Sequence, residues 1–369
     1  MADQSPDEAA HAAEERSQHR TVADIAAAVG LSKSTVSRAL SGSPLVHAAT
    51  RERILQATRE LGYEPNRIAQ SLSTRSSPFV GVVMPDIDHI SFARMLKGAR
   101  AELGRAGYQV LVMETEREPE QEAAAIRTLL AHRVAGILLA TFGGYEPCRV
   151  PVVFFDHVLA DEGAGRVSLA NMEGADLLVG HLHEQGHTRI GFIGGAPGSS
   201  CADERCDGFQ LALARRWLAV PPEYVKTGDR TWSEESGERA ASELIALDPP
   251  PTAIMAADDG LAIGALRALR RVGRRVPEDV ALVCFDDPQY NDVIDPPLTV
   301  VAYDACAVGA SAAQLLLEQL SEPRAPRDVR IPVELIVRCS SSAAQSPATA
   351  SDRQLLRGAG RHVLAPETT

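Results

Sequence analysis

The sequence predicts a small all-α segment followed by a large α/β body of two doubly wound parallel sheets. In residues 21–72, apolar positions repeat at helical spacing and are separated by helix caps and a tight turn. From Phe79 onward, short Val- and Ile-rich runs alternate with helical patterns, as in parallel sheets that helices cover on both faces. About 260 ordered residues follow the first segment, enough for two subdomains.

The first helix is expected to begin at Thr21, because Asp24 three residues later completes a capping-box variant. Positions 22, 25, 26 and 29 are apolar and share one face of that helix. Gly30 supplies the left-handed residue that ends the helix, and Ser32 caps the next one. Residues 21–40 therefore predict two short helices around a tight turn.

The second of these helices turns a polar face outward. Val36 and Leu40 face the core, which leaves Lys33, Ser34 and Arg38 outside. Arginine can bind guanine O6 and N7 together, and lysine can reach the same edge in the major groove. Hydroxyl groups bind phosphate and set register, so the order of caps and polar residues indicates DNA binding rather than a hairpin with solvated side chains. The hydroxyl candidates are Ser32, Thr35, Ser37 and Ser41.

Residues 50–72 predict a third helix and then a short basic helix, PNRIAQSL (65–72), that ends in Leu72. A leucine at this place could be inserted into the minor groove. About eight residues are too few for a stable isolated helix in water. We therefore expect a hinge helix that forms only when DNA and the hinge of a second copy support it.

This order of residues resembles the headpiece of LacI/GalR-type bacterial transcription regulators. The resemblance implies that Lys33, Ser34 and Arg38 read bases and that the residue at Leu72 enters the minor groove. One departure is His47, which stands where a better cap usually begins the third helix. The matching residues are Thr21, Asp24, Ala26, Gly30, Ser32, Thr35, Val36, Ser37, Arg38, Leu40, Thr50, Arg51, Leu61, Gly62, Tyr63, Pro65, Asn66 and Leu72. The predicted DNA-binding residues are Thr21, Ser32, Lys33, Ser34, Thr35, Ser37, Arg38, Tyr63, Asn66, Ala69 and Leu72.

Charge supports a DNA-binding end on an acidic body. The chain carries −12 overall, whereas residues 20–76 hold eight Lys and Arg against four acids. Such a segment is oriented toward DNA by its own field. No apolar run approaches the roughly 18 residues of a membrane span, and the acidic N-terminus does not resemble a signal peptide. The six cysteines show no CxxC pair and are interpreted as reduced, buried thiols of a cytoplasmic protein.

The body predicts strands and helices in alternation. The apolar runs have the lengths of strands and the patterns between them the lengths of helices, which is typical of doubly wound domains. The expected strands are 79–85, 108–114, 134–141, 151–156, 189–195, 252–257 and 280–286. The expected helices are 92–106, 119–132, 171–185, 203–219, 234–247, 259–272 and 304–320.

Several predicted strands end in acids. Ligands of such sheets bind outside the carboxyl ends of the strands, so a polar cleft is expected there. Any single Asp could instead cap a helix, and for Asp259 and Asp287 capping is favoured. The strand-end acids are Asp86, Asp156, Asp258, Asp259, Asp286 and Asp287, and a loop over 196–201 leads into Arg205.

The same family resemblance extends over about residues 20–340. It implies two periplasmic-binding-protein-like subdomains, a chain that crosses between them three times, and an effector held by acids, Arg205 and an aromatic face from Trp232. A partly buried core indole is the alternative for Trp232. The candidate effector-binding residues are Asp86, Phe92, Asp156, Arg205, Trp232, Asp258 and Asp286.

Two departures from the family pattern fall at this cleft. Many relatives carry Asn-Pro-Phe-Phe after the first strand, where this chain has His89, Ile90, Ser91 and Phe92, and only Phe92 matches. An acid commonly precedes the position of Asn171, and here it is Ala170. Effector identity is therefore not carried over from the family.

No catalytic or cofactor motif was found. His181, His183 and His187 do not share a helix face, so they are not expected to bind metal. The Gly-rich loop at 194–198 lacks the phosphate-binding patterns, and no G-x-S-x-G elbow occurs. A solute-binding protein or a sugar-modifying enzyme of similar fold is the competing class.

The sequence therefore predicts a non-enzymatic, cofactor-free repressor that binds a palindromic operator as a homodimer and a small-molecule effector, first of all a sugar. A nucleobase or a phosphorylated co-repressor is the alternative effector. The predicted divisions are a disordered acidic tail (1–19), a DNA-binding headpiece (20–65), a hinge helix and linker (66–77), an effector-binding and dimerisation domain (78–340) and a disordered tail (341–369).

Overall fold

The computed structural model describes residues 21–40, 43, 45–63, 77–159, 163–228, 232–322 and 325–342. The chain divides into two compact units, residues 1–78 and 79–369, and each is described by itself. The predicted N-terminal tail, the hinge helix and nearly all of the C-terminal tail lie outside the described residues. Within the part described, no helix combines the length and the apolar character that crossing a membrane requires.

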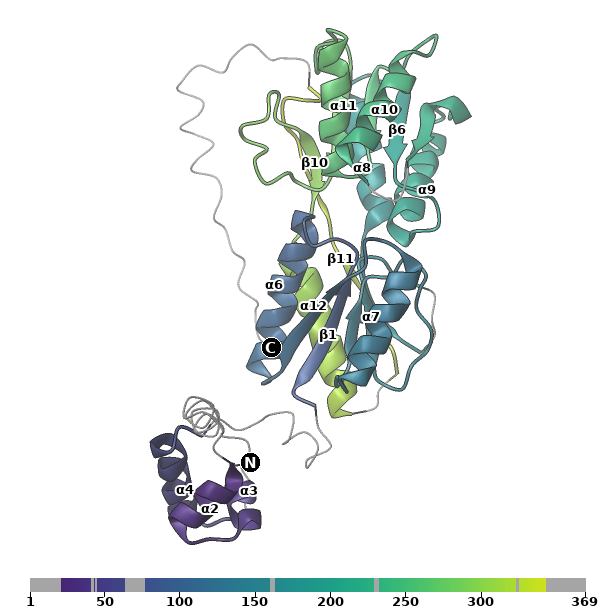
Figure 1. The fold of residues 1–369 in the computed structure, drawn as a ribbon. Helices are drawn as coiled ribbons and strands as arrows, with labels where there is room; N and C mark the ends of the chain where they lie inside the picture. The colour runs from purple at the N-terminus through teal and green to yellow at the C-terminus, as the bar shows by residue number, and fades with distance from the viewer. Residues whose placement is uncertain are drawn as a thin grey trace, which may run out of the picture. The chain divides into compact units, whose positions relative to one another are not determined.

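The described residues of the first unit form a headpiece of three helices, α2 (Val22–Val29), α3 (Lys33–Leu40) and α4 (Ala48–Glu60) (Figure 1). Its small core is made by Ile25, Val36 and Ile54, each 0% exposed. One fully buried residue from each helix fixes how the three pack.

The predicted helix ends of the headpiece are confirmed. Asp24 Oδ2 accepts a hydrogen bond from the Thr21 backbone N–H at 2.8 Å, and Gly30 has a left-handed φ of 66°. Ser32 Oγ accepts from the Thr35 N–H at 3.2 Å. His47 precedes α4 without a side-chain capping bond, as its residue type predicted.

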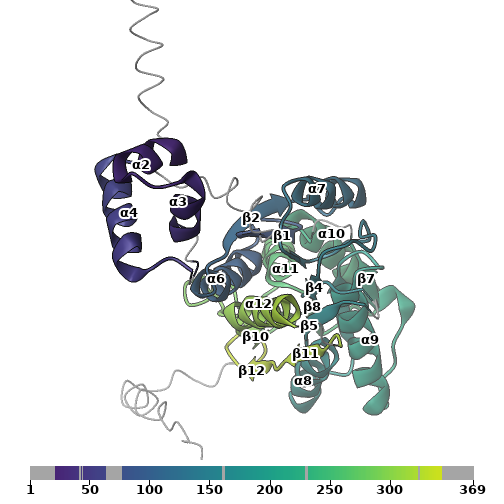
Figure 2. The ribbon, with the colours of Figure 1, turned by 90° about the horizontal axis from the view of Figure 1, so that it is seen from below.

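The second unit contains two six-stranded sheets, and the first has the order β11-β5-β4-β3-β1-β2 with every neighbouring pair parallel. Helices α6 (Ile90–Arg105) and α12 (Ala305–Ser321) cover one face, and α7 (Pro119–Ala131) covers the other (Figure 2). The strands are β1 (Phe79–Met84), β2 (Gln109–Glu114), β3 (Ile137–Leu139), β4 (Val152–Phe155), β5 (Gly165–Leu169) and β11 (Asp328–Ile331).

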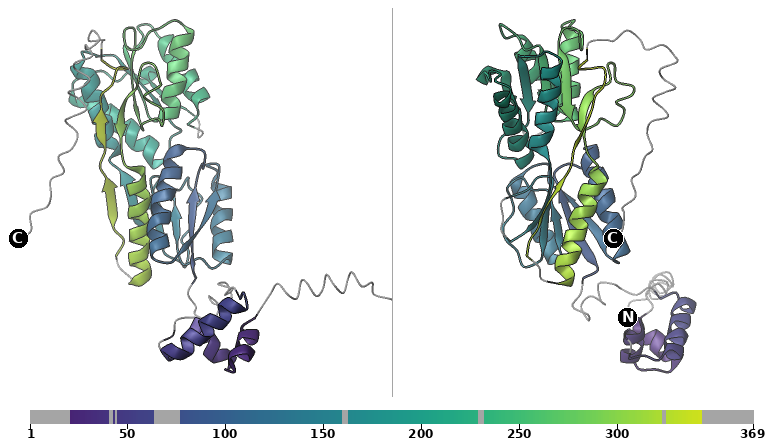
Figure 3. Two further views of the ribbon diagram at one scale, coloured as in Figure 1. Left: turned by 90° about the vertical axis from the view of Figure 1, so that its left-hand side faces the viewer. Right: turned by 180° about the vertical axis from the view of Figure 1, so that it is seen from behind.

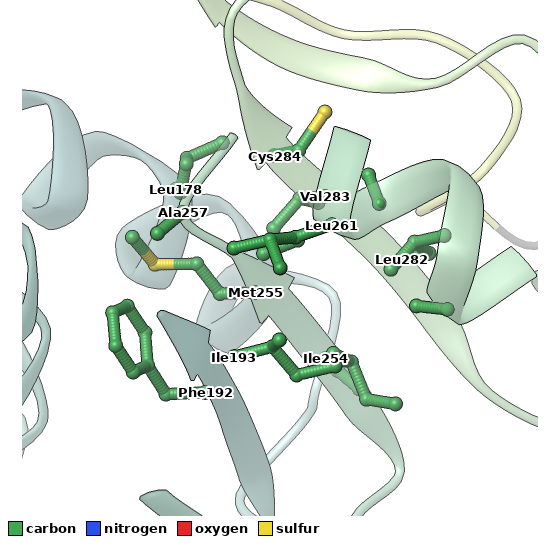
Figure 4. Close-up of a cluster of buried hydrophobic side chains, with 14 of the residues drawn as sticks. Leu178, Phe192, Ile193, Ile254, Met255, Ala257, Leu261, Leu282, Val283 and Cys284 are labelled. Carbon is green, nitrogen blue, oxygen red and sulfur yellow. The ribbon is translucent and has the colours of Figure 1, made fainter. Parts of the chain in front are cut away.

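The second sheet has the order β12-β10-β9-β8-β6-β7, parallel except for β12, which runs antiparallel to β10. Helices α8 (Asn171–Glu184) and α9 (Ser200–Arg215) pack on one face, and α10 (Glu234–Ile245) and α11 (Asp259–Arg271) on the other. Its core joins the central strands to α8 and α11 (Figure 4). The strands are β6 (Ile190–Gly194), β7 (Val225–Thr227), β8 (Ala253–Ala256), β9 (Ala281–Phe285), β10 (Thr299–Ala302) and β12 (Glu334–Ile336), and a 3-10 turn, η1 (Pro222–Tyr224), precedes β7.

The chain passes between the two sheets three times, as the family resemblance implied. The passages lie between β5 and α8, between β10 and α12, and between β11 and β12. Figure 3 shows the last of them in yellow-green, running from the first subdomain into the second. The three connections are short, and each subdomain has core clusters of its own.

The sequence did not predict every strand, and the missed ones lie at or next to one edge of a sheet. Strands β5, β7, β10, β11 and β12 had no predicted range of their own, and α9 begins at Ser200, three residues before the predicted start. Each missed strand is only three to five residues long and includes at least one half-buried or exposed position. They therefore lack the continuous apolar run that marked the central strands.

Candidate functional site

The outer face of α3 is the first candidate site. Lys33, Ser34, Ser37 and Arg38 are exposed, as predicted. Thr35 is half-buried, and its hydroxyl lies 2.8 Å from that of exposed Ser32. A cationic and hydroxylated face on one short helix fits the major groove and its phosphates.

The remaining predicted DNA contacts divide into two groups. Thr21 is exposed at the start of α2, and Tyr63 is half-buried against the headpiece core. The backbone N–H of Tyr63 donates to the Thr58 carbonyl at 3.0 Å, which holds the end of α4. Asn66, Ala69 and Leu72 lie outside the described residues.

The second candidate site is a cleft between the two subdomains of the second unit, where the carboxyl ends of the strands meet. Its free volume is about 30 Å³, room for one or two water molecules, so the cleft is closed and must open to admit a larger ligand. It is lined by His89, Ser91, Phe92, Arg117, Asp156, His157, Cys201, Arg205, Trp232, Asp258, Asp286 and Tyr303.

Four of these residues have a left-handed backbone. The φ angles are 61° at Arg117, 59° at Asp156, 52° at Trp232 and 65° at Asp286. Non-glycine residues adopt this conformation rarely, and it is concentrated where function fixes the backbone. The clustering indicates that the chain turns sharply to aim these side chains into the cleft.

Arg205 is the central cation of the cleft. It is 4% exposed, and its Nη1 lies 3.4 Å from Asp286 Oδ2. Its Nε donates to Asn171 Oδ1 at 2.9 Å, and its guanidinium lies 4.2 Å from the centre of the Phe285 ring. Fixed on three sides, the guanidinium can orient a polar ligand without rearranging.

Aromatic rings form the apolar wall of the cleft. Trp232 is 8% exposed, so it belongs both to the core and to the cavity lining, and the two interpretations of this residue hold together. A Cβ on Gly195 would lie 2.2 Å from Trp232 Cε2, so the indole position requires glycine there. The ring centroids of Phe92 and Phe142 lie 6.1 and 4.4 Å from that of the His157 imidazole.

The titratable groups of the cleft are strongly perturbed. Burial, reinforced by the Asp286 charge and opposed by Arg205, raises the pKa of Asp156 to about 6. Burial lowers the pKa of His157 to about 3, with Arg205 acting in the same direction. His157 is therefore neutral, and its Nδ1 lies 2.7 Å from Ser199 Oγ across the cleft.

His89 and Asp259 shift together. Burial lowers the pKa of His89, but the adjacent carboxylate of Asp258, followed by Asp286 and Asp259, outweighs burial and raises that pKa to about 9. Burial and the same neighbouring acids raise the pKa of Asp259 to about 7. The imidazole is protonated because it is the nearest available counter-ion.

Two expectations about the strand-end acids need correction. Asp258, and not Asp259, caps α11, with its Oδ1 accepting from the Leu261 N–H at 2.7 Å. Asp287 caps no helix and is paired with Arg338 at 2.7 Å. Chain direction at the strand end decides which of two adjacent carboxylates meets the helix N-terminus.

Asp86 contributes to the cleft indirectly. It is absent from the residues that line the cavity, and its Oδ2 accepts from Arg117 Nη1 at 2.9 Å. It thereby holds Arg117, which does reach the cavity. Six of the seven predicted effector-binding residues therefore line the cavity, and Asp86 does not. The six are Phe92, Asp156, Arg205, Trp232, Asp258 and Asp286.

Several cavity residues had not been predicted. Tyr303 directly follows β10, a strand that was not predicted, and the others lie in loops or in the first turn of a helix. The departure from the family pattern at 89–91 and the loop over 196–201 were the available indications. The unpredicted residues are His89, Ser91, Arg117, His157, Cys201 and Tyr303. All six cysteines are free, but only Cys201 and Cys284 are buried, and Cys339 is exposed, which corrects the expectation of uniformly buried thiols.

Two groups in the described residues have donor atoms close enough for a metal ion, within 4.8 Å of one another: Asp156 with His157 and Cys201, and His89 with Asp258 and Asp259. The first lies beside the Arg205 cation, and burial raises the pKa of the Cys201 thiol well above its usual value. Both features oppose a metal cation. The histidines at 181 and 187 bond separate hydroxyls, of Ser341 and Thr252.

Comparisons with known proteins match both units. The family described as bacterial regulatory proteins, lacI family, matches residues 21–66, and a periplasmic binding protein-like domain matches residues 179–341. The transcriptional repressor CytR of Escherichia coli K12 is 32% identical over 88% of this chain and 96% of its own length. The ribose operon repressor of Bacillus subtilis 168 is 32% identical over 86% and 97%. The crystal structure of the Lac repressor dimer bound to operator and the anti-inducer ONPF has a TM-score of 0.78 at 27% identity, covering 88% of this chain and all of that one.

Proposed function

We propose that this chain, which belongs to the lacI family of bacterial regulatory proteins, represses transcription from a palindromic operator. It would bind the operator as a cytoplasmic homodimer, and a sugar would control the binding. Members of this family are DNA-binding transcriptional repressors rather than enzymes, and this chain is one of them. The operator symmetry, the dimer and the sugar are the proposed parts.

The exposed face of α3 carries the operator-reading part of the proposal. Lys33, Ser34 and Arg38 are assigned to bases, and the neighbouring hydroxyls, Tyr63 and Asn66 to phosphates. Residues 66–77, with Ala69 and Leu72, are assigned to a hinge. Residues 20–65 then form the DNA-binding headpiece and 78–340 the effector-binding and dimerising domain.

The effector assignment rests on the cleft. It combines a buried guanidinium, several carboxylates and an indole, and this combination suits the hydroxyls and the apolar face of a sugar. One relative is named as the repressor of a ribose operon. A phosphorylated co-repressor is disfavoured because acids outnumber cations around the cavity, and a nucleobase stays the second candidate because of the aromatic wall.

The dimer assignment rests on an open sheet edge. Strand β2 lies at the end of its sheet, with no further described strand beside it, and all of its residues are exposed or half-buried. Beside it lies a groove of about 660 Å³ that includes Leu96, Tyr108 and Val112. An uncovered edge strand with apolar neighbours invites pairing with another chain, and a second copy would cover it.

A gel shift with the DNA upstream of the protein's own gene tests the proposal. We expect a shift at low salt that candidate sugars change. Arg38→Ala should weaken binding by about 1–3 kcal/mol and relax the preference for one base pair. The control is Arg59→Ala, because Arg59 lies on α4, exposed and paired with Glu52. Absence of any shift, with or without sugars, would overturn the proposal.

A further inference from the structure

The cleft carries an excess of negative charge. Four carboxylates face one guanidinium and the imidazole of His89, while Arg117 is neutralised by Asp86 at 2.9 Å. When all four carboxyl groups are ionised, even a protonated imidazole leaves two negative charges unbalanced. The carboxylates are those of Asp156, Asp258, Asp259 and Asp286, and the guanidinium is that of Arg205.

This imbalance is costly because the groups are buried. Asp156, Asp258 and Asp286 are 6%, 3% and 5% exposed, where water screens charge poorly. Burial, with the neighbouring acids, raises the pKa values of Asp156 and Asp259. A cation entering the cleft would relieve that cost, and an anion would increase it.

The imidazole of His89 fills this role incompletely. Its Nε2 lies 3.8 Å from Asp258 Oδ2 and 3.6 Å from Asp259 Oδ1, beyond the 2.7–2.9 Å of a good charge-assisted hydrogen bond. Its Nδ1 is buried without a hydrogen-bond partner among the described residues. The His89 ring therefore has one N–H group without an acceptor among the described residues, and its other N–H group is too far from Asp258 and Asp259 for a strong hydrogen bond.

The residue also connects the two subdomains. His89 precedes α6 in the first subdomain, whereas Asp258 and Asp259 begin α11 in the second. Opening the cleft to admit a ligand must therefore separate this ion pair, which frees both carboxylates for a new partner.

We propose that the effector carries a positively charged amine, as in an amino sugar, and that its ammonium group takes the place of the His89 imidazolium between Asp258 and Asp259. This assignment rests on the proposed function of the cleft as the effector site. An ammonium group has three donors on one small centre, so it can approach both carboxylates closely. The hydroxyl groups and the apolar face of the same ligand would meet Arg205 and Trp232.

The cation subsite can be tested without knowing the effector. In full-length His89→Ala protein at pH 7, where Asp259 is partly ionised and imidazole is partly protonated, imidazole should raise the melting temperature saturably, by about 2–4 °C at ten times its apparent Kd. Pyrazole has the same shape but is neutral, and it should have no effect. Equal stabilisation by the two compounds, or by neither, would overturn the proposal.

Two further variants locate the effect. Adding Asp258→Asn or Asp259→Asn to His89→Ala should abolish the response to imidazole, and asparagine keeps the capping capacity of Asp258. Asp304→Asn is the matched control, because Asp304 caps α12 with its Oδ1 accepting from Ala307 N–H at 3.1 Å and is exposed. A loss of the response in this control as well would overturn the assignment to Asp258 and Asp259.

The wild-type protein supplies the direct test. Glucosamine, galactosamine and mannosamine are compared with glucose, galactose and mannose by calorimetry and by the operator gel shift. At least one amino sugar should bind at least tenfold more tightly than its hydroxyl counterpart. If neutral sugars bind equally or better, or if no amine binds, while the protein still shifts operator DNA, the amine assignment is wrong. If the protein does not shift operator DNA at all, the proposed function is wrong instead.

Discussion

At the scale of single residues, the cleft is built by backbone turns that few residue types accept easily. Asp156 and Asp286 directly follow strands β4 and β9, Trp232 shortly precedes α10, and all three have a positive φ and line the cavity. The strand-end acids could be predicted because chain direction in a parallel sheet places them together. His89 and His157 could not, because their positions depend on how loops of two separate sheets meet, and Tyr303 could not, because the strand before it, β10, was not predicted.

The protonation of His89 gives the cleft a defined pH dependence. Its pKa in the folded protein, about 9, lies above the ordinary 6.5, so its contribution to stability is full below 6.5 and is lost as pH rises through 9. Above pH 7 Asp259 is largely ionised, which leaves His89 as the main titrating group of the cleft. Urea unfolding should show a loss of about 2 kcal/mol between pH 7 and 9. The loss should be absent in His89→Gln, and equal slopes for both proteins would contradict the ion pair.

The indole of Trp232 should depend on the absence of a side chain at position 195. Gly195→Ala places a Cβ 2.2 Å from the indole, so the ring must shift at a cost of about 1–3 kcal/mol. With the exposed Trp217 replaced by Phe, the fluorescence of Trp232 should then move toward that of a hydrated indole. Gly104→Ala is the control, since nothing lies within 4 Å of its Cβ position. An unchanged spectrum in Gly195→Ala would contradict this packing.

At the scale of elements, the strands that the sequence predicts are mostly those that are buried along their whole length. Strands β1, β6, β8 and β9 are almost wholly buried, so apolar runs mark them unambiguously. Strand β5 alternates buried and half-buried residues, and this pattern in five residues is hard to distinguish from a loop. Helix caps are local, so α2 and α3 could be placed from the sequence with their ends.

The turn between α2 and α3 should be the most sensitive point of the headpiece. Gly30 has a φ of 66° and no neighbour near its Cβ position, so Gly30→Ala should destabilise the headpiece by backbone strain alone, by about 1 kcal/mol. Amide exchange over residues 21–63 should accelerate, and operator affinity should fall. Gly30→Asn should cost less, because asparagine tolerates the left-handed region. An equal effect of both substitutions would indicate a steric cause instead.

At the scale of the whole molecule, DNA binding and ligand binding lie in separate compact units, so control requires a connection between them. Each subdomain has its own core, and contacts such as His157–Ser199 and Ser91–Asp286 join them across the closed cleft. A ligand that favours one arrangement of the subdomains can change operator affinity only through its differential binding to the two states. Operator DNA must then change ligand affinity by the same factor.

Dimerisation is the step that would connect this motion to a palindromic operator. Val112 on β2 is 38% exposed, and Val112→Asp would place a charge in the proposed interface. Sedimentation should show a monomer where the wild type is a dimer, and operator affinity should fall at least a hundredfold because two half-sites are no longer bound together. Leu211→Asp is the control, because Leu211 is similarly exposed at 40% but lies on α9. If Val112→Asp stays dimeric, or if Leu211→Asp dissociates as readily, strand β2 does not form the interface.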